Sequence, residues 1–416
     1  MTKNCLLFLL LILLFSCSNE SDEADSLPLS KEQNIHFEKA EDTGIEMNDE
    51  PGYKKPEDNV SKTESRKSSS QAMRSQTFPV PELEKLVYEA IQSKNTTDPV
   101  VLSKASNQIV MRQESGTFTS LNSYFIIDFE NDIFTNTDYY FTNGAQLSII
   151  LPTLQHFYVS KIMPSAGKNA MNHYKLSLRQ NMYTPINPEA TEIDFNDRPF
   201  AGIMLMELSK ISTSHKNRIR ITTGFQLGTI GKSSLAEAIQ QNMHELEPIG
   251  WKYQISEDLL INLAMKAEKA VVLNRHHELI FFSKASIGTY LNEIEGGFMY
   301  KTGFLSGIFN PFPIAAAGSF EYLEPRKPFR FCIFIEGGAR HNFFNATFEG
   351  GFFNHHSPYV IENNRRIRNI AQLTTGVELA YRRTALQLKL VYLSPEFKGG
   401  FDHRWGAISI LQNLNK

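Results

Sequence analysis

The chain has few cysteines, little net charge and no long apolar run after its N-terminus. Its three cysteines in 416 residues, Cys5, Cys17 and Cys332, form no CxxC pair, so neither a disulfide framework nor a cysteine metal site is expected. The net charge of −3 argues against nucleic-acid binding. No later segment has enough consecutive apolar residues for a membrane helix. This absence leaves a β-barrel open, because barrel strands alternate apolar and polar residues.

Two common hydrolase signatures are also missing. The sequence contains neither a Gly-x-Ser-x-Gly elbow nor a His-Glu-x-x-His helix motif. A serine hydrolase of that type and transition-metal hydrolysis therefore have no local support. The oxygen-bearing side chains of Asn131, Asp132 and Gln240 instead suit a hard cation such as Ca²⁺.

The first residues predict export. Lys3 precedes an apolar run over residues 5–15, which is too short to span a bilayer and has the length of a signal-peptide core, so residues 1–16 are predicted to be a signal peptide. The run ends in Leu14-Phe15-Ser16-Cys17, which resembles a bacterial lipobox, and we expect Cys17 to carry lipid. The alternative is an ordinary cleaved signal followed by a chance cysteine. Both place the protein outside the cytoplasm.

Residues 17–115 differ in composition from the rest of the chain. Up to about residue 78 they are rich in Ser, Glu, Asp, Lys and Asn and poor in apolar residues. Such a segment cannot offset its ordering entropy, so we expect it to be a largely disordered periplasmic linker. A short amphipathic helix is possible near 79–93, with Leu83, Leu86 and Val87 on one face. Residues 116–416 are predicted to form one catalytic domain.

The domain over residues 116–416 shows the pattern of a membrane barrel. In 386–390 apolar and polar residues alternate, and the polar positions Gln387 and Lys389 would face a lumen. The strands have close to the 9–11 residues that a tilted strand needs to cross a bilayer. We therefore predict an all-β fold, a transmembrane antiparallel β-barrel of about twelve strands with a disordered N-terminal extension. A soluble β-sandwich, which also alternates, is the alternative. The predicted strands are 122–130, 143–152, 173–181, 199–209, 218–226, 260–269, 278–288, 294–303, 330–340, 371–381, 385–393 and 405–411.

The parity of the strands divides the connections into two sets. If both ends of the barrel domain lie in the periplasm, the connections after odd-numbered strands point out of the cell. These outer connections are 131–142, 182–198, 227–259, 289–293, 341–370 and 394–404. All the motifs discussed below fall among them. Two inner connections, 153–172 and 304–329, are long for periplasmic turns, and the pattern does not explain them.

The first outer connection concentrates amide, carboxylate and hydroxyl groups among aromatic residues. Turn chemistry explains Asn143-Gly144 without any function. It does not explain Asn131-Asp132 at the end of a strand. A loop that is polar and aromatic at once more often carries a site than a plain turn does, so we expect one here.

The connection 227–259 holds a second candidate. Ser234 and Glu237 have the spacing of a capping box, which predicts the start of a helix. Gln240 and His244 lie one turn apart and therefore share a face of that helix. A histidine beside an amide suits a general base next to an orienting or metal-binding carbonyl, although a solvated or packed histidine is the commoner case. Trp251 follows the helix and suits a membrane interface.

Three further groups in the outer connections have two interpretations each. Arg198, in Asp197-Arg198-Pro199, either belongs to a turn before a strand or binds a phosphate. The pair His355-His356 has no third ligand at a usual spacing, which favours a solvated pair over a metal site. Arg365, Arg366 and Arg368 would lie near anionic lipid head groups if the topology holds.

Taken in order, these motifs resemble the outer-membrane lipid A 3′-O-deacylases, a family of twelve-stranded barrels. The resemblance covers about residue 120 to the C-terminus. Phe141 and Phe200 depart from it, because the family usually has Tyr there, and the lipobox with its long polar segment is not typical. The motifs are Glu130-Asn131-Asp132-Ile133-Phe134, Thr137-Asp138-Tyr139-Tyr140-Phe141-Thr142-Asn143-Gly144, Asp197-Arg198-Pro199-Phe200-Ala201-Gly202, Gly228-x-x-Gly231-x-x-Ser234-Leu235, Gln240-x-x-x-His244, Gly250-Trp251-x-x-Gln254, Ser394-Pro395-Glu396-Phe397 and His403-Arg404-Trp405-Gly406-Ala407-Ile408-Ser409.

The resemblance implies Ca²⁺-dependent hydrolysis of ester-linked acyl chains at the 3′ position of lipid A. It implies that His244 is the general base that activates water. It also implies that Ca²⁺ or the ester is held by Asn131, Asp132 and Gln240. A cation there would polarise the ester carbonyl and stabilise the oxyanion. Arg198 and Thr142 are the residues expected to contact the substrate.

We also expect a monomer in the bacterial outer membrane, with lipopolysaccharide of the outer leaflet as its partner. Two other functions remain open from the sequence. One is a Ca²⁺-dependent phospholipase at the same surface, since both enzymes need a base, a cation and a membrane-facing cleft. The other is a non-catalytic barrel that serves as an adhesin, a channel or a lipid-binding protein.

Overall fold

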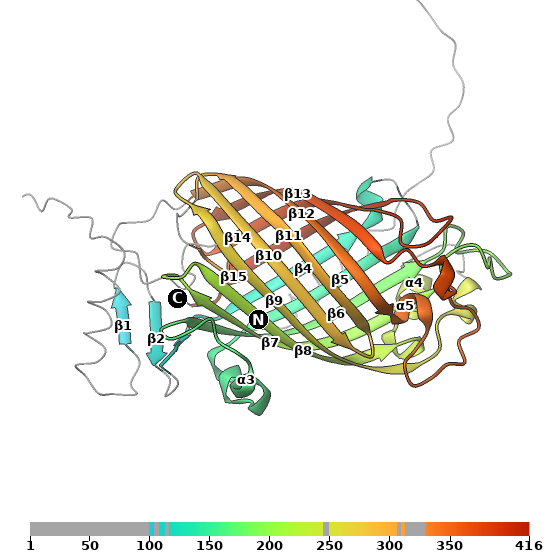
Figure 1. Ribbon diagram of the computed structural model, residues 1–416, viewed down its shortest axis with the longest axis horizontal. Helices are drawn as coiled ribbons and strands as arrows, with labels where there is room; N and C mark the ends of the chain where they lie inside the picture. Colours follow the sequence, from blue (N-terminus) through green and yellow to red (C-terminus); the bar gives the residue numbers. More distant parts are fainter. Residues whose placement is uncertain are drawn as a thin grey trace, which may run out of the picture. The chain divides into compact units, whose positions relative to one another are not determined.

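Twelve long antiparallel strands close into a barrel in a computed structural model, which describes residues 100–103, 108–112, 116–135, 137, 139–243, 249–305, 309–312 and 329–415 (Figure 1). The barrel closes because the last strand, β15, pairs with the first, β4, and because β6 pairs with both β5 and β7. The strands are β4 (Tyr124–Asn131), β5 (Tyr140–Ile150), β6 (Met171–Thr184), β7 (Ala201–Ser214), β8 (Ile219–Ile230), β9 (Asp258–Leu273), β10 (His277–Gly288), β11 (Leu291–Gly303), β12 (Phe329–Asn345), β13 (Asn369–Tyr381), β14 (Thr384–Leu393) and β15 (His403–Asn413).

The predicted fold class is confirmed, and each of the twelve predicted strands overlaps one strand of the barrel. Most run further than predicted; β12, for example, continues five residues beyond residue 340 to Asn345. None of the helices in the described part of the chain is long and apolar enough to span a membrane.

Residues 17–115 are described only in part. Two short strands lie within this segment, β1 (Val100–Ser103) and β2 (Gln108–Arg112). They join the barrel sheet through β3 (Phe118–Ser120), which pairs in parallel with the start of β6. The predicted signal peptide, Cys17 and the helix predicted near 79–93 lie outside the described residues.

Side chains alternate between the lumen and the outer surface of the wall, as the sequence pattern predicts. Gln387 and Lys389 of β14 line a cavity in the lumen, whereas Leu388 and Leu390 are exposed on the outside. Several charged groups in the lumen form ion pairs, which offsets the cost of removing them from water. The pairs include Lys284 Nζ with Glu293 Oε1 at 2.9 Å, Lys301 Nζ with Glu378 Oε2 at 3.2 Å and Arg220 Nε with Glu268 Oε2 at 3.6 Å.

We call the end at which β4 begins and β15 ends the inner end of the barrel, and the opposite end the outer end. Part of the long inner connection between β11 and β12, residues 309–312, enters the lumen at the inner end. The described part of it includes Phe309 and Phe312, and both are buried. The Phe312 ring lies 4.9 Å from the Tyr124 ring and 5.1 Å from the His173 ring, centroid to centroid. The Arg220 guanidinium lies 4.1 Å from the Phe309 ring centroid.

The other long inner connection, between β5 and β6, forms η2 (Pro152–His156) and α3 (Tyr158–Ile162). These short helices lie at the inner end, where Figure 1 shows α3 projecting beside β7. The described residues of the two connections that the sequence pattern left unexplained both pack against the barrel. One enters the lumen, and the other packs outside it.

The outer end carries the remaining helices. They are η1 (Asp132–Thr135), η3 (Lys232–Ser234), α4 (Ala236–Met243), η4 (Ile249–Tyr253), α5 (Ala346–Glu349) and η5 (Asn363–Arg365). Figure 1 shows α4 and α5 at the end of the barrel opposite α3.

The predicted lipid-facing role of the three arginines is wrong for Arg366. Its side chain is fully buried, its guanidinium lies 4.0 Å from the Phe348 ring centroid, and its Nε is 3.4 Å from Glu349 Oε1. Burial lowers the pKa of Arg366 to about 10. Arg368 donates to the same Glu349 carboxylate, and Arg365 donates to the carbonyls of residues 195 and 196. These arginines hold the outer loops to one another.

Candidate functional site

The polar residues that end β4 lie on the outer face of the wall, not in the lumen. Asn131 is opposite Asn143 of β5 in the sheet register, Asn143 is opposite Met182 of β6, and Met182 is opposite Gly202 of β7. The neighbouring residue Glu130 lines the luminal cavity, so Asn131 and the row it begins face the other way. The row is buried even so, because another part of the chain covers it.

The covering segment is the connection that holds α4. Ala236, at the start of α4, packs with Met182, Phe200 and Trp251 in one buried cluster. Gly202 makes the close approach possible: a Cβ on it would lie 2.2 Å from Ser234 Oγ and 2.4 Å from the Ala236 Cβ. The glycine therefore sets the distance between the helix and the wall.

The helix begins close to the predicted position but without the predicted capping box. Ser234 Oγ donates to the carbonyl oxygen of Gly231 at 2.6 Å. The Glu237 carboxylate accepts a hydrogen bond from Gln254 Nε2 at 3.0 Å instead of closing on Ser234. This contact ties the first turn of α4 to the segment that follows η4.

Gln240 is buried on α4, and its side-chain oxygen accepts a hydrogen bond from the indole nitrogen of Trp251. An amide oxygen has two lone pairs, so this bond leaves one free. Trp251 is fully buried. Its predicted position at a membrane interface is therefore wrong; the indole holds Gln240 in place. His244 lies outside the described residues.

Asn131 and Asp132 are held by the turn that they begin. Asn131 Oδ1 accepts a hydrogen bond from the backbone N–H of Ile133 at 2.8 Å. The carbonyl of Asp132 accepts a hydrogen bond from Thr135 Oγ1 at 2.8 Å, and Thr135 also donates to the carbonyl of Arg404 at 2.9 Å. The turn is thus tied to β15, and the Asp132 carboxylate is buried beside the Asn131 row.

Thr142 lies in the same region, at an irregularity of the β5–β6 register between Phe141 and Asn143. Its hydroxyl forms a hydrogen bond of 2.7 Å with the hydroxyl of Thr184. An extra residue at such a bulge changes where a side chain points. Thr142 is therefore brought close to the Asn131–Asn143 pair, whereas its predicted contact with substrate stays a prediction.

Arg198 lies on the luminal side and is fully enclosed, with a side chain that is 1% exposed. Its guanidinium lies between two rings, 4.3 Å from the centroid of Tyr183 and 4.3 Å from that of Phe348. Nη1 is 4.0 Å from Glu396 Oε2, which offsets part of the burial that lowers the pKa of Arg198. This arginine joins three outer segments, and its predicted contact with a phosphate stays a prediction.

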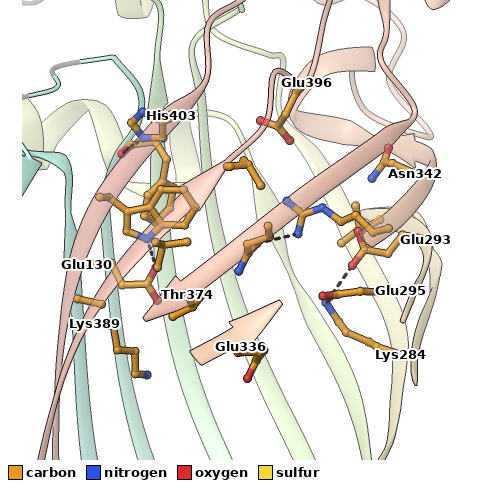
Figure 2. Close-up of a pocket in the computed structure, with 18 of the residues that line it drawn as sticks. Glu130, Lys284, Glu293, Glu295, Glu336, Asn342, Thr374, Lys389, Glu396 and His403 are labelled. Carbon is orange, nitrogen blue, oxygen red and sulfur yellow. Dashed lines mark hydrogen bonds and ion pairs between the residues drawn. The ribbon is translucent and has the colours of Figure 1, made fainter. Parts of the chain in front are cut away.

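A second polar region lies across the wall, inside the lumen. A cavity of about 490 Å³ is lined there by charged and aromatic side chains. Figure 2 shows His403 and Glu396 toward one end of it and Glu336 and Lys389 toward the other. His403 is buried, and its Nε2 lies 3.2 Å from the carbonyl oxygen of Phe141. The luminal cavity and the Asn131 row are thus separate regions that share one wall.

Among the described residues there is no cluster of three or more His, Cys, Asp and Glu side chains arranged to hold a metal ion. Asn131 and Asn143, together with the neighbouring Asp132 and Thr142, nevertheless offer amide, carboxylate and hydroxyl oxygens within a buried region. Such a donor set fits Ca²⁺, which takes oxygen ligands from carboxylates and amide carbonyls. It lacks the nitrogen and sulfur donors that zinc favours.

Sequence reasoning missed two of the residues that build this site. Asn143 was assigned to turn chemistry, but it is paired with Asn131 in the sheet. Trp251 was assigned to the membrane interface, but it positions Gln240. The strand register would have revealed the first. No local signal in the sequence reveals the role of Trp251, because its indole lies on η4 and the Gln240 amide lies on α4.

Comparison with known proteins identifies a family. The model of the family described as outer membrane protein LpxR matches residues 96–414. The solved structure of LpxR from Salmonella typhimurium matches with a TM-score of 0.55 at 17% identity, covering 70% of this chain and 99% of that chain. No curated protein matches the sequence.

Two other barrels are less similar. The β domain of the Bordetella autotransporter BrkA has a TM-score of 0.32 at 6% identity, covering 70% of this chain and 98% of that chain. The NanC porin has a TM-score of 0.31 at 6% identity, covering 70% of this chain and 100% of that chain.

Proposed function

Because the chain belongs to the outer membrane protein LpxR family, we propose that it is an outer-membrane lipid A deacylase that hydrolyses ester-linked acyl chains at the 3′ position. One observation carries the proposal. The motif after β4 and the motif on α4 are far apart in the sequence, yet the Asn131 row joins them through neighbouring positions on β5, β6 and β7. Two polar motifs that border one buried patch of wall support a single active site there.

The position of the patch suits a lipid substrate. It lies on the outer face of the wall beneath the α4 segment, so a lipid that diffuses in the membrane approaches its edge without entering the lumen. Exposed apolar side chains surround it at the outer end: Phe134 of η1, Leu235 before α4 and Ile249 of η4. These side chains can contact acyl chains while the polar groups beside them contact the ester.

The proposed chemistry assigns one role to each group. His244, following α4, is the general base that removes a proton from the attacking water. Asn131 and Asp132 would hold Ca²⁺ through their side-chain oxygens. The side-chain oxygen of Gln240 would be a further ligand, through the lone pair that Trp251 does not use. Bound Ca²⁺ would supply Lewis-acid polarisation of the ester carbonyl, an effect worth several kcal/mol. The hydroxyl of Thr142 would position the substrate.

Mass spectrometry of lipid A tests the proposal. Cells that express the wild-type protein are expected to lose a 3′-linked acyl chain from lipid A, and the loss should stop when Ca²⁺ is removed. The variant His244→Ala is expected to lower the rate by about a hundredfold or more, because general-base catalysis contributes roughly 10²–10⁴. His355→Ala is the matched control, because His355 is an exposed histidine of another outer connection.

Two results would contradict parts of the proposal separately. If lipid A stays intact while glycerophospholipids are cleaved, the protein is a phospholipase and the substrate assignment is wrong. If His244→Ala is as active as His355→Ala, the base is misassigned whatever the substrate. A barrel that cleaves neither lipid is not a hydrolase.

A further inference from the structure

The connection between β5 and β6 packs against the outer face of the wall at the inner end. In β7, Glu207 pairs with luminal Lys175, so odd-numbered residues of this strand face the lumen and even-numbered ones face outward. The outward residues Lys210 and Ser212 hold the connection. Lys210 Nζ donates to the carbonyl of Met163 at 3.1 Å, and Ser212 Oγ accepts from the backbone N–H of Ala166 at 2.9 Å.

The connection has one buried face and one exposed apolar face. Leu154 and Met163 are buried against the barrel. Phe157, Tyr158 and Ile162 point away from it and are 57%, 77% and 66% exposed. Three large apolar side chains within six residues, on an element that is firmly held, form a surface that water would disfavour.

This surface continues the membrane-facing band of the wall. Further along the same strands, Leu178 of β6 and Met206 of β7 lie opposite each other in the register, and both are 47% exposed on the outer face. Lys161 and Lys168 are exposed on the connection itself. From the middle of the wall toward the inner end, the exposed side chains are therefore first Leu178 and Met206 and then the aromatic and aliphatic residues of the connection. The lysines lie among the residues of the connection.

The length of the bare wall, the part of the barrel's outer face that no connection covers, gives an independent argument for contact between the connection and the membrane. On β6 the outward residues Met182 and Tyr174 are both buried, the first under the α4 segment and the second at the inner end. The eight residue steps from Tyr174 to Met182 span roughly 26 Å along the strand at about 3.3 Å each. With a tilt of about 40°, that is roughly 20 Å across the membrane, which is less than the usual apolar band of about 25 Å. The covering segments must therefore contribute apolar surface themselves.

We propose that residues 152–168 form an interfacial anchor, in which Phe157, Tyr158 and Ile162 enter the boundary between head groups and acyl chains of the phospholipid leaflet at the inner end. Tyr158 suits this depth because its ring is apolar and its hydroxyl is polar. Lys161 and Lys168 lie beside the lipid phosphates, with their stems along the apolar surface. The anchor makes up for the short bare wall on β6 and β7.

Tryptophan fluorescence in lipid vesicles tests the anchor. The full chain carrying Tyr158→Trp is inserted into vesicles of phosphatidylcholine and phosphatidylglycerol that contain lipids brominated at a shallow or a deep acyl position. The native Trp251 and Trp405 are buried and provide a constant background. The added tryptophan should be quenched at least twofold more by the shallow bromines than by the deep ones, and its emission should shift to the blue.

Two matched variants set the scale. Leu178→Trp, on the bare wall, should be quenched more by deep bromines. Lys216→Trp, exposed in the turn between β7 and β8, should not be quenched. If Tyr158→Trp behaves like Lys216→Trp while Leu178→Trp is quenched, the connection lies in water and the proposal is wrong. Folding of each variant is checked by its heat-modifiable migration in gels, and Tyr158 is exposed enough to be replaced without repacking.

Discussion

Gly202 lies where one methyl group decides whether α4 can contact the wall. In Gly202→Ala the new Cβ would be 2.4 Å from the Ala236 Cβ, which has no rotamer that turns away. The helix must therefore move outward, and Gln240 moves with it. Since a displacement of about 1 Å can cost a hundredfold in rate, we expect lipid A deacylation to fall by about that factor.

The measurement for Gly202→Ala is the deacylation rate at equal amounts of folded barrel. Gly296→Ala is the control, because Gly296 is also a strand glycine and the nearest atom to a Cβ placed there is 4.0 Å away. Gly296→Ala should keep full activity. Equal activity of the two variants would show that the distance between α4 and the wall does not matter for the reaction.

At the same scale, composition identified Asn131 and Asp132 as more than turn residues, but it did not reveal which side of the wall they face. That depends on register, because a shift of one residue moves a side chain from the lumen to the outer surface. Asn143 is not predicted as a site residue for the same reason. An Asn-Gly pair is fully explained as a turn unless its partner in the sheet, here Asn131, is known. The partner of Gln240 was also unreadable, since eleven residues separate it from Trp251.

At the scale of elements, Phe312 of the inner connection between β11 and β12 belongs to the apolar core of the barrel's inner end. Phe312 packs there with Tyr124, Ile150 and Leu411. Removing a buried aromatic ring usually costs about 3–5 kcal/mol, so Phe312→Ala should lower the free energy of unfolding by that amount. Urea unfolding in detergent micelles measures it.

The control for Phe312→Ala comes from the same connection. Phe304 is 57% exposed, and Phe304→Ala should change the free energy of unfolding by less than about 0.5 kcal/mol. If the two variants lose the same stability, Phe312 contributes no more than an exposed ring, and the packing of the inner end is not what stabilises it.

The strands themselves were predictable and their inner connections were not, for one physical reason. In a strand with one face in the lumen and one in the membrane, polar and apolar residues alternate, so the sequence itself shows the strand. In β14, for example, Gln387 and Lys389 face the lumen and Leu388 faces outward. The connections have no such period. Their structure depends on distant partners, such as Lys210 for the carbonyl of Met163.

At the scale of the whole molecule, the barrel has two chemically different ends, and the orientation in the membrane follows from which end holds the candidate site. We predict that the outer end faces the medium. In His355→Cys the new thiol should react with a membrane-impermeant maleimide on intact cells. In Lys216→Cys it should react only after the cells are permeabilised, because the turn between β7 and β8 lies at the inner end.

The wild-type chain is the control for labelling, since Cys332 is buried and its thiol should not react. Labelling of Lys216→Cys but not of His355→Cys on intact cells would reverse the orientation. It would also place the candidate site away from the outer leaflet, where lipid A lies.

The pairing of β4 with β15 joins the first barrel strand to the last. Its outermost pair is Asn131 with Gly406, and Thr135 beside Asp132 is tied to the carbonyl of Arg404. The turn that carries the candidate site is therefore secured only when the final segment of the chain is in place. A precursor crossing the periplasm has no such seam, so the candidate site is complete only after the step in which β15 pairs with β4 and the barrel closes.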